Sequence, residues 1–211
     1  MRILITAGPT CEDIDPVRYI TNRSSGTMGY AAAAEAARRG HEAILVSGPT
    51  ALEPPEGVEM VPVRSAADML AACLERFAAC DAAILVAAVA DYRPADYSPQ
   101  KLKKDNGDLV LRLARTEDIA QRLGALKARQ ILVGFALESD EGHASAEAKL
   151  AAKNLDAIVL NHPDTLGAGT IAAEVLTCAG GWEPPERLSK PQLAARILDL
   201  VEEQARARQR S

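Results

Sequence analysis

Short apolar runs alternate along the chain with longer stretches of helical periodicity. The runs with the length and residue types of β-strands are 2–7, 42–47, 59–63, 82–88, 109–113, 131–135, 157–160 and 174–178. Apolar residues recur at helical spacing over 28–39, 66–79, 117–127, 144–154 and 191–208. This alternation is typical of a mainly parallel sheet covered by helices. Because 211 residues suffice for one sizeable core, we expect a single α/β domain over residues 1–211.

Several helix ends carry sequence signals. Ser65 and Ser189 stand before predicted helices and are expected N-caps, the second followed by Pro191 near the helix start. Gly40 follows Arg38 and Arg39, the order that a helix C-terminus favours. Residues 8–27, 90–108 and 162–173 form three long connections. Long loops in compact domains are usually functional, so we look for the chemistry there.

The charge balance argues against nucleic acid as a partner. Lys and Arg number 24 against 29 Asp and Glu, a formal net charge of −5. One Trp, four Tyr and two Phe are too few for a base-stacking platform. The chain has neither a membrane-length apolar run nor a signal-peptide layout at its start. We therefore expect a cytoplasmic protein without a nucleic-acid or membrane partner.

A glycine-containing turn opens the predicted helix at 28–39. Ser24, Ser25, Gly26 and Gly29 would let phosphate oxygens approach backbone N–H groups at the positive end of the helix. Simple packing of the helix on a strand is the alternative. A dinucleotide site is disfavoured, because these glycines lie far downstream of the first strand and the strand at 42–47 ends without a carboxylate for a ribose.

The connection over residues 8–27 is rich in side chains that can bind a substrate. Arg18 can clamp a phosphate or carboxylate with two hydrogen bonds, and Asn22 can donate to an acyl oxygen while accepting from an amine. The alternative is a solvated arm whose Val17, Tyr19 and Ile20 dock on another subunit. Both interpretations can hold together.

A second group follows the apolar strand at 82–88. Ala87 and Ala88 leave room for a ligand at a strand end, and Asp91 follows them, as a ligand contact or as a cap of a turn. The basic run at 101–104 then indicates either a solvated face or a phosphate-binding flap. A third group comprises Phe135, at another strand end, and Lys149 and Lys153, one helical turn apart on one face. The two lysines could contact one polar ligand. The alternative is that Phe135 is a core residue and the lysines form a solvated stripe.

Taken together, these segments closely resemble the phosphopantothenate–cysteine ligase family. The matching blocks keep the family order over most of the chain: ITAGPT (5–10), DPVRYITNRSSGTMG (15–29), AAVADYRP (87–94), KLKK (101–104), GFALE (134–138) and KLAAKNLD (149–156). The resemblance implies a Rossmann-like, doubly wound sheet with helices on both faces, and a homodimer. It also implies that 4′-phosphopantothenate and L-cysteine are joined through an acyl-nucleotide. The nucleoside triphosphate that the resemblance favours is CTP over ATP, with Mg²⁺ held by the triphosphate rather than by an assigned residue.

The resemblance assigns a role to each matching position. Asn22 corresponds to the asparagine that holds the intermediate and serves the second half-reaction, Lys101 to the essential lysine of a flap at 92–108, and Arg18 to an arginine near the phosphopantothenate that the partner subunit supplies. The substrate edge corresponds to Arg18, Asn22, Ala87, Ala88 and Asp91. The nucleotide positions are Gly8, Ser24, Ser25, Gly26, Gly29, Ala87, Asp91, Lys101, Glu117, Asp118, Ile119, Ala120, Phe135, Lys149 and Lys153.

The sequence departs from the family at a few points. Thr27 stands where relatives often have a basic residue, Leu137 replaces a common alanine, and His162 follows Asn161 where an acidic residue is frequent; we assign His162 no role. Many bacterial relatives carry a flavin decarboxylase domain before the ligase, and here the ligase strand begins at residue 2; we therefore expect either a free-standing ligase or a decarboxylase on a separate polypeptide. A nucleotide-binding regulatory module without turnover is the main alternative function, and an NAD-dependent oxidoreductase is the third.

Overall fold

The parallel strands form a sheet with the strand order of a Rossmann fold. The computed structural model describes residues 1–104, 107–137, 142–161, 170–178 and 180–210. In space the strands run β5 (Val58–Pro62), β4 (Glu42–Ser47), β1 (Arg2–Ala7), β6 (Ala82–Leu85), β9 (Ile131–Leu137) and β10 (Ala157–Asn161), all parallel. Numbered along the chain, this is the doubly wound order 3-2-1-4-5-6. The predicted doubly wound, mainly parallel sheet is confirmed.

An antiparallel extension completes one edge of the sheet. β11 (Thr170–Thr177) pairs antiparallel with β10, and β12 (Gly181–Trp182) and β13 (Glu186–Ser189) both pair with β11. The sequence predicts only the part at 174–178. Residues 170–173, expected in a loop, belong to β11, while residues 162–169 of that loop, including His162, lie outside the described residues.

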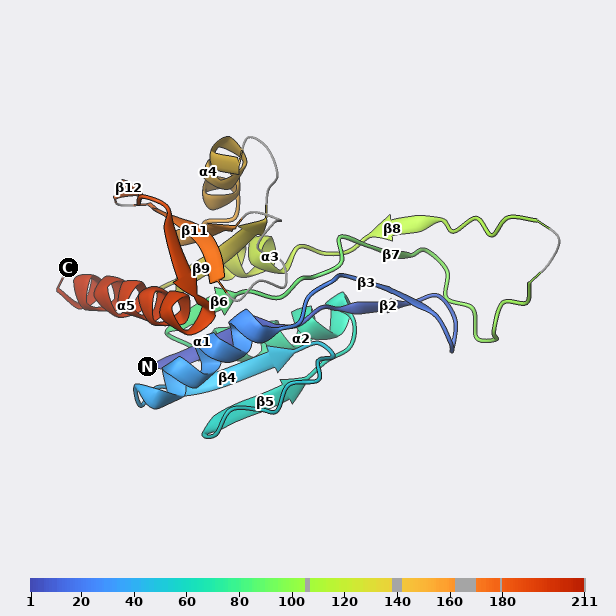
Figure 1. Cartoon of the computed structure of the whole chain (residues 1–211), viewed down its shortest axis with the longest axis horizontal. Helices are drawn as coiled ribbons and strands as arrows, with labels where there is room; N and C mark the ends of the chain where they lie inside the picture. The colour runs from blue at the N-terminus through green and yellow to red at the C-terminus, as the bar shows by residue number, and fades with distance from the viewer. Residues whose placement is uncertain (105–106, 138–141, 162–169, 179, 211) are drawn as a thin grey trace.

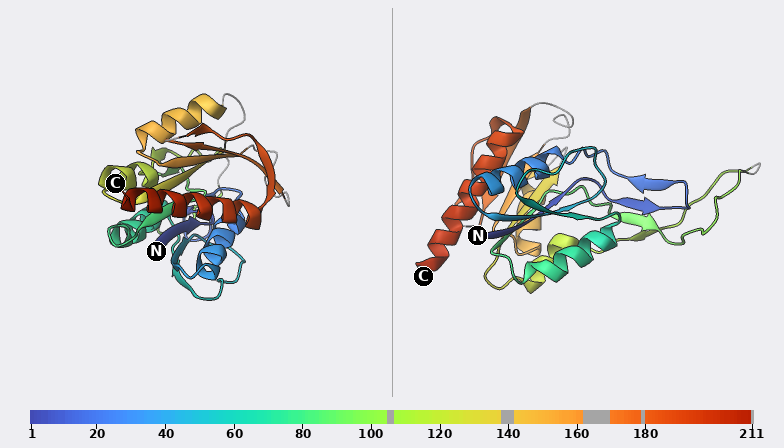
Figure 2. Two further views of the ribbon diagram at one scale, coloured as in Figure 1. Left: turned by 90° about the vertical axis from the view of Figure 1, so that its left-hand side faces the viewer. Right: turned by 90° about the horizontal axis from the view of Figure 1, so that it is seen from below.

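Helices cover both faces of the sheet, as predicted (Figure 2). α1 (Thr27–Arg38) and α5 (Lys190–Gln209) share one apolar core with Ile3 and Ile5 of β1. α2 (Ala66–Phe77), α3 (Ile119–Leu126) and α4 (Gly142–Ala152) share the other core with Leu4. The division follows from the strand geometry, because successive side chains of a strand point to opposite faces.

The predicted helix caps are present. Ser65 and Ser189 each accept a hydrogen bond from a backbone N–H three residues later, and both form capping boxes, with Asp68 and Gln192. Gly40 has a left-handed backbone conformation, with φ of 78°, directly after the C-cap Arg39 of α1.

Two hairpins extend together beyond the sheet (Figures 1 and 2). The first, which we call the arm (residues 11–21), joins β2 (Cys11–Asp13) to β3 (Tyr19–Thr21). The second carries the flap between β7 (Tyr92–Pro94) and β8 (Leu113–Arg115), and β2 lies beside β7. The connections at 8–27 and 90–108, expected without strands, therefore contain short ones. Residues 105–106 of the flap lie outside the described residues.

Two predicted strands differ from the structure. Residues 109–112 are not in a strand: Leu109 and Val110 are exposed, and this segment pairs with no strand among the described residues. Of the predicted strand, only Leu113 belongs to β8. β6 ends at Leu85 rather than at residue 88. The hydroxyl oxygen of Thr6 accepts hydrogen bonds from the next two backbone N–H groups, those of Val86 and Ala87 (3.1 and 3.2 Å), which turns the chain away from the ladder.

Among the residues that the structure describes, no helix combines the length and the apolar character needed to cross a membrane.

Candidate functional site

A cleft of about 760 Å³ opens where the parallel strands β1, β6, β9 and β10 end. In doubly wound sheets ligands bind at this edge, beside the point where the strand order reverses. The cleft brings together nearly all the predicted site residues from segments far apart in the sequence: Gly8, Asn22, Ser24, Ser25, Gly26, Gly29, Ala87, Ala88, Asp91, Glu117, Asp118, Ile119, Ala120, Phe135, Lys149 and Lys153.

The glycines at the start of α1 serve two different purposes. Gly26 is the N-cap of α1 and has a φ of 77°, a conformation that side chains disfavour. Gly29 has no such requirement, but a Cβ there would lie 2.5 Å from the Ala7 Cβ and 2.9 Å from the Thr6 carbonyl oxygen. Gly29 therefore allows α1 to pack closely on β1. The packing interpretation of the turn is correct for Gly29, and it is compatible with a ligand in the cleft that both glycines line.

The positive end of α1 faces the cleft. No side chain among the described residues caps this helix, and its first turn carries no acidic residue. The surrounding hydroxyls hydrogen-bond one another or the turn itself: Ser25 Oγ lies 2.6 Å from Thr27 Oγ1, and Ser24 Oγ accepts from the Gly26 N–H at 3.3 Å. An uncapped helix N-terminus with nearby hydroxyls favours an anionic ligand.

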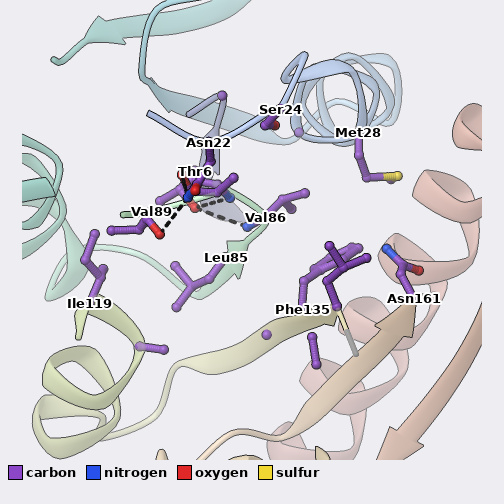
Figure 3. A pocket seen from close by; sticks show the side chains of 18 of the residues that line it. Thr6, Asn22, Ser24, Met28, Leu85, Val86, Val89, Ile119, Phe135 and Asn161 are labelled. Atoms are coloured by element: carbon purple, nitrogen blue, oxygen red, sulfur yellow. Dashed lines mark hydrogen bonds between the residues drawn. The ribbon is translucent and has the colours of Figure 1, made fainter. Parts of the chain in front are cut away.

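Asn22 lies opposite the turn that follows β6 (Figure 3). Its side-chain Nδ2 donates to two backbone carbonyls, those of Ala88 and Val89, at 3.1 Å each. That turn is also tied to the segment after β1, because the Ala88 N–H donates to the Gly8 carbonyl at 2.9 Å. With both amide protons directed at carbonyls, the Asn22 Oδ1 is the atom that a ligand donor would meet.

Acidic and basic side chains meet on the wall formed by α3 and the end of α4. Asp118 caps α3 by accepting from the Gln121 N–H, and its Oδ2 pairs with Lys153 Nζ at 2.7 Å. Burial raises the pKa of the Asp118 carboxyl, but the hydrogen bonds from Lys153 and Gln121 outweigh burial, so the pKa lies below its usual value. Glu117 pairs with Arg122. The predicted helix at 117–127 starts later, at Ile119, which leaves Glu117 and Asp118 in the connection that lines the cleft.

The sequence analysis missed several residues at the other end of the cleft. Figure 3 shows Met28 and Asn161 beside the predicted Phe135. The Asn161 Oδ1 is buried and has no hydrogen-bond partner among the described residues, which makes it an acceptor for a ligand donor or a water. Asn161 could have been found, because it directly follows the apolar run at 157–160, at the end of a strand. Other residues that line the cleft without having been assigned to the site from the sequence include Thr6, Arg23, Thr27, Leu137 and Lys190.

Two predicted residues do not line the cleft. Lys101 is exposed on the flap, and Arg18 lies on the arm, where its guanidinium contacts Asp15 and the Leu102 carbonyl. In this chain, the side chains of Arg18 and Lys101 therefore lie outside the cleft that the other predicted residues line. Glu138, the last residue of the GFALE block, lies outside the described residues.

The strand order and the position of the cleft define a class, a Rossmann-like α/β domain with its candidate site at the carboxyl ends of the parallel strands. Within this class, residues 1–205 match the model of the DNA/pantothenate metabolism flavoprotein C-terminal domain, and the chain belongs to this family.

Similar proteins and structures agree with this assignment. The coenzyme A biosynthesis bifunctional protein CoaBC of Bacillus subtilis is 51% identical over 168 residues, which cover 79% of this chain and 41% of that protein. The corresponding protein of Vibrio cholerae is 42% identical over 209 residues, 96% of this chain and 52% of that protein. The chain thus spans about half the length of these relatives. A crystal structure of the C-terminal domain of CoaBC matches with a TM-score of 0.84 and 44% identity, covering 96% of this chain and 94% of that one.

Proposed function

We propose that this chain is a phosphopantothenate–cysteine ligase. It would join 4′-phosphopantothenate to L-cysteine, with release of a nucleoside monophosphate and pyrophosphate. The observation that carries the proposal is the composition of one cleft. The uncapped N-terminus of α1, Asn22, and Lys149 and Lys153 at the end of α4 all line this cleft. The relatives named for coenzyme A biosynthesis and the block-by-block resemblance of the sequence support it.

The first half-reaction must activate a carboxylate. An amine does not displace oxide from a carboxylate at neutral pH, so the phosphopantothenate carboxylate attacks the α-phosphate and pyrophosphate leaves. The positive end of α1 and the side chains of Lys149 and Lys153 line the cleft, where they would stabilise phosphoryl oxygens. Lys101 would add a further cation from the flap. One well-placed donor of this kind contributes about 3 kcal/mol to the stabilisation of the transition state.

The second half-reaction forms the amide. The cysteine amine attacks the acyl carbon, the bond to the nucleotide phosphate breaks, and the monophosphate leaves with the bonding electrons. Asn22 would orient the amine through Oδ1, since its Nδ2 is held by the Ala88 and Val89 carbonyls. The first step transfers the nucleotidyl group to the substrate carboxylate, and the second transfers the acyl group to the cysteine amine, which gives up a proton as the amide forms. In both steps a substrate is the nucleophile, so the proposal requires no nucleophile from the protein.

A nucleoside triphosphate would bring its own metal ion. No three His, Cys, Asp or Glu side chains in the described part of the chain gather closely enough to hold one. We therefore assign Mg²⁺ to the triphosphate oxygens, where it would neutralise charge on the leaving pyrophosphate. The resemblance favours CTP over ATP, and the backbone at 117–120 is the proposed contact for the base.

The proposal includes a homodimer. Arg18 and Lys101 lie outside the cleft of their own chain, so a partner's arm and flap would supply them. Most of the large apolar side chains that the described residues expose lie on the arm or on the hairpin from β7 to β8: Val17, Tyr19, Tyr92, Tyr97, Leu109, Val110 and Leu113. Such a concentration marks an association surface.

A phosphopantothenoylcysteine decarboxylase remains a predicted partner.

Pyrophosphate release tests the function directly. With phosphopantothenate, Mg²⁺ and CTP but no cysteine, we expect about one pyrophosphate per site, followed by steady release once cysteine is added. The same assay with ATP measures nucleotide preference. Binding of nucleotide without any pyrophosphate would instead indicate a regulatory module.

Two variants separate the half-reactions. Lys101→Gln should lower the rate of the first pyrophosphate burst by about a hundredfold, because it removes charge stabilisation of the transition state. Asn22→Asp should form the acyl-nucleotide and consume it slowly, because the carboxylate cannot donate to the Ala88 and Val89 carbonyls. Normal bursts in Lys101→Gln, or normal turnover in Asn22→Asp, would remove the assigned roles.

A further inference from the structure

The arm is fixed to the body of the protein by a buried carboxylate. Glu12, 4% exposed, accepts from the Ala66 N–H at 2.8 Å, where it meets the positive end of α2. The Cys11 N–H donates to the Arg64 carbonyl at 2.8 Å, and Arg64 pairs with Asp13 at 2.6 Å. These contacts hold β2 at a set angle to the sheet, so the arm is a firm support for whatever it touches.

The flap touches this support through Asp15. Asp15 is 1% exposed, and its Oδ1 accepts from the Val17 and Arg18 N–H groups at 2.8 and 2.9 Å. Its Oδ2 accepts from Arg18 Nε at 3.0 Å, from Arg18 Nη2, and from the Leu102 N–H of the flap at 3.1 Å. Arg18 Nη2 also donates to the Leu102 carbonyl at 2.9 Å. Both backbone polar groups of Leu102 are therefore bound, one residue after Lys101.

A second contact holds the same part of the flap. The Ser98 N–H donates to the Ile14 carbonyl at 3.0 Å. The flap is thus attached to the arm on both sides of Lys101, at Ser98 and at Leu102, while the Lys101 side chain is exposed. Movement of Lys101 relative to Arg18 is restricted to what these contacts allow.

The geometry points to Asp15 as a positioning residue that presents Arg18 and Lys101 as one cationic pair. Asp15 does not contact the cleft; it acts by holding the Arg18 guanidinium and the Leu102 backbone in one place. Since Nε and Nη2 of Arg18 are occupied, a ligand would meet this guanidinium at Nη1. Only the catalytic consequence of this inference rests on the proposed ligase function.

A carboxylate is needed at this position for chemical reasons. A buried negative charge is costly unless it is paired and hydrogen-bonded, and Asp15 accepts five hydrogen bonds from the groups named above. The hydrogen bonds from Arg18 hold the pKa of the Asp15 carboxyl well below its usual range. We call the contacts of Asp15 with Arg18 and Leu102 the clamp. The Asp15 carboxylate stays ionised at every pH at which an enzyme assay is run, so a change of pH cannot open the clamp and its test requires a substitution.

Amide hydrogen exchange on the full chain tests the clamp without any substrate. In Asp15→Asn, an NH₂ group would replace the carboxylate oxygen that accepts from Arg18 and from the Leu102 N–H. Because an NH₂ group cannot accept these hydrogen bonds, we expect the Leu102 N–H to exchange at least about tenfold faster than in the unmodified protein. Peptides from β1 and β6 should exchange unchanged, which excludes general unfolding. Asp13→Asn is the matched control, because Asp13 lies on the same arm and pairs with Arg64 rather than with the flap; the Leu102 N–H of this variant should keep its protection.

Enzyme kinetics then test the positioning role. Asp15→Asn should lower the rate of the pyrophosphate burst by about tenfold or more while the KM for the nucleotide stays within about twofold, because the cleft is intact and only the cations are misplaced. Unchanged exchange at Leu102 would overturn the clamp, and faster exchange with a normal burst would overturn its catalytic consequence. If the unmodified protein releases no pyrophosphate with either nucleotide, the ligase proposal fails, and amide exchange still decides whether the clamp exists.

Discussion

Three glycines of this chain differ in why a side chain is excluded. At Gly26 the backbone is left-handed and Thr50 Cγ2 would also lie 2.7 Å from a Cβ. At Gly29 only space is lacking. At Gly40 the backbone is left-handed, with φ of 78°, but nothing lies within 4 Å of the Cβ position. These positions allow the cost of crowding to be separated from the cost of backbone conformation.

We expect Gly29→Ala to lower the free energy of unfolding by about 2–3 kcal/mol, because α1 must move away from Ala7 and Thr6. Gly40→Ala is the control for backbone conformation and should cost about 1 kcal/mol. Urea denaturation at pH 7 measures both. Nucleotide binding should weaken only in Gly29→Ala, since the displaced helix lines the cleft; equal effects of the two substitutions would contradict the packing role.

At the scale of elements, ion pairs join the end of α1 to α5. Glu35 accepts from Arg38 and Arg39 of the same region at 2.7 Å, and Arg39 continues to Asp199 at 2.7 Å and to Glu202 at 3.2 Å on α5. Arg39 Nη2 also donates to the Ala195 carbonyl at 3.0 Å. The hydrogen bond from Arg38 is the main cause that lowers the pKa of Glu35 to about 2, although burial opposes it.

A pH-dependent stability difference follows from this lowered pKa. Because the folded-state pKa of Glu35 lies below its ordinary value of 4.5, its stabilising contribution is complete above about pH 4.5 and is lost as the pH falls towards 2. We expect Glu35→Gln to lower the free energy of unfolding by about 1–2 kcal/mol at pH 7. The difference should vanish near pH 2. Urea titrations at several pH values measure it, with the exposed Glu53→Gln as control; a difference that persists unchanged at pH 2 would contradict the assignment.

At the scale of the whole molecule, the arm and the flap extend away from the sheet (Figure 1). Large apolar side chains on them are exposed. Val110 is 86% exposed. The same region holds Arg18 and Lys101 outside the cleft of their own chain. A second copy of the chain would cover this surface and complete the cleft, which is the physical basis of the proposed homodimer.

If the proposed homodimer forms through the arm, Val17→Glu should convert it to monomers, because the substitution places a charge in the contact while leaving the folded chain intact. Leu126→Glu is the matched control, since Val17 and Leu126 are both 59% exposed but Leu126 lies at the end of α3, away from the arm. Sedimentation at several protein concentrations measures the mass. A dimer unaffected by Val17→Glu, or one broken equally by Leu126→Glu, would argue against the arm as the contact.

Mixed dimers test whether Arg18 acts in the partner's cleft. Arg18→Ala and Asn22→Ala should each be inactive alone. If statistical mixing pairs the two chains, about a quarter of the clefts contain both native residues and activity returns to that level. Absence of recovery after verified exchange would argue against a role of Arg18 in the partner's cleft.

Much of the fold follows from local pattern. The buried strands of the parallel sheet read as apolar runs because both of their faces are covered by helices, and Ser65 and Ser189 mark helix starts by chemistry that involves only the next three residues. The sequence did not predict the short strands of the two projecting hairpins, because three paired residues create no apolar run. The strand predicted at 109–113 was wrong over 109–112, because an apolar or alternating run forms a strand only when a neighbouring strand is available to pair with it.

By itself, the sequence determined the six strands of the parallel sheet and the helices that cover them, and the family that its blocks resemble. It also identified half of the residues that line the cleft, because parallel strands bring their carboxyl ends to one edge. Only the tertiary structure decided that Gly29 is a packing residue, that Asn161 reaches the cleft, and that Asp15 joins Arg18 to the flap. These facts depend on contacts between segments distant in sequence, whose distances no local pattern encodes.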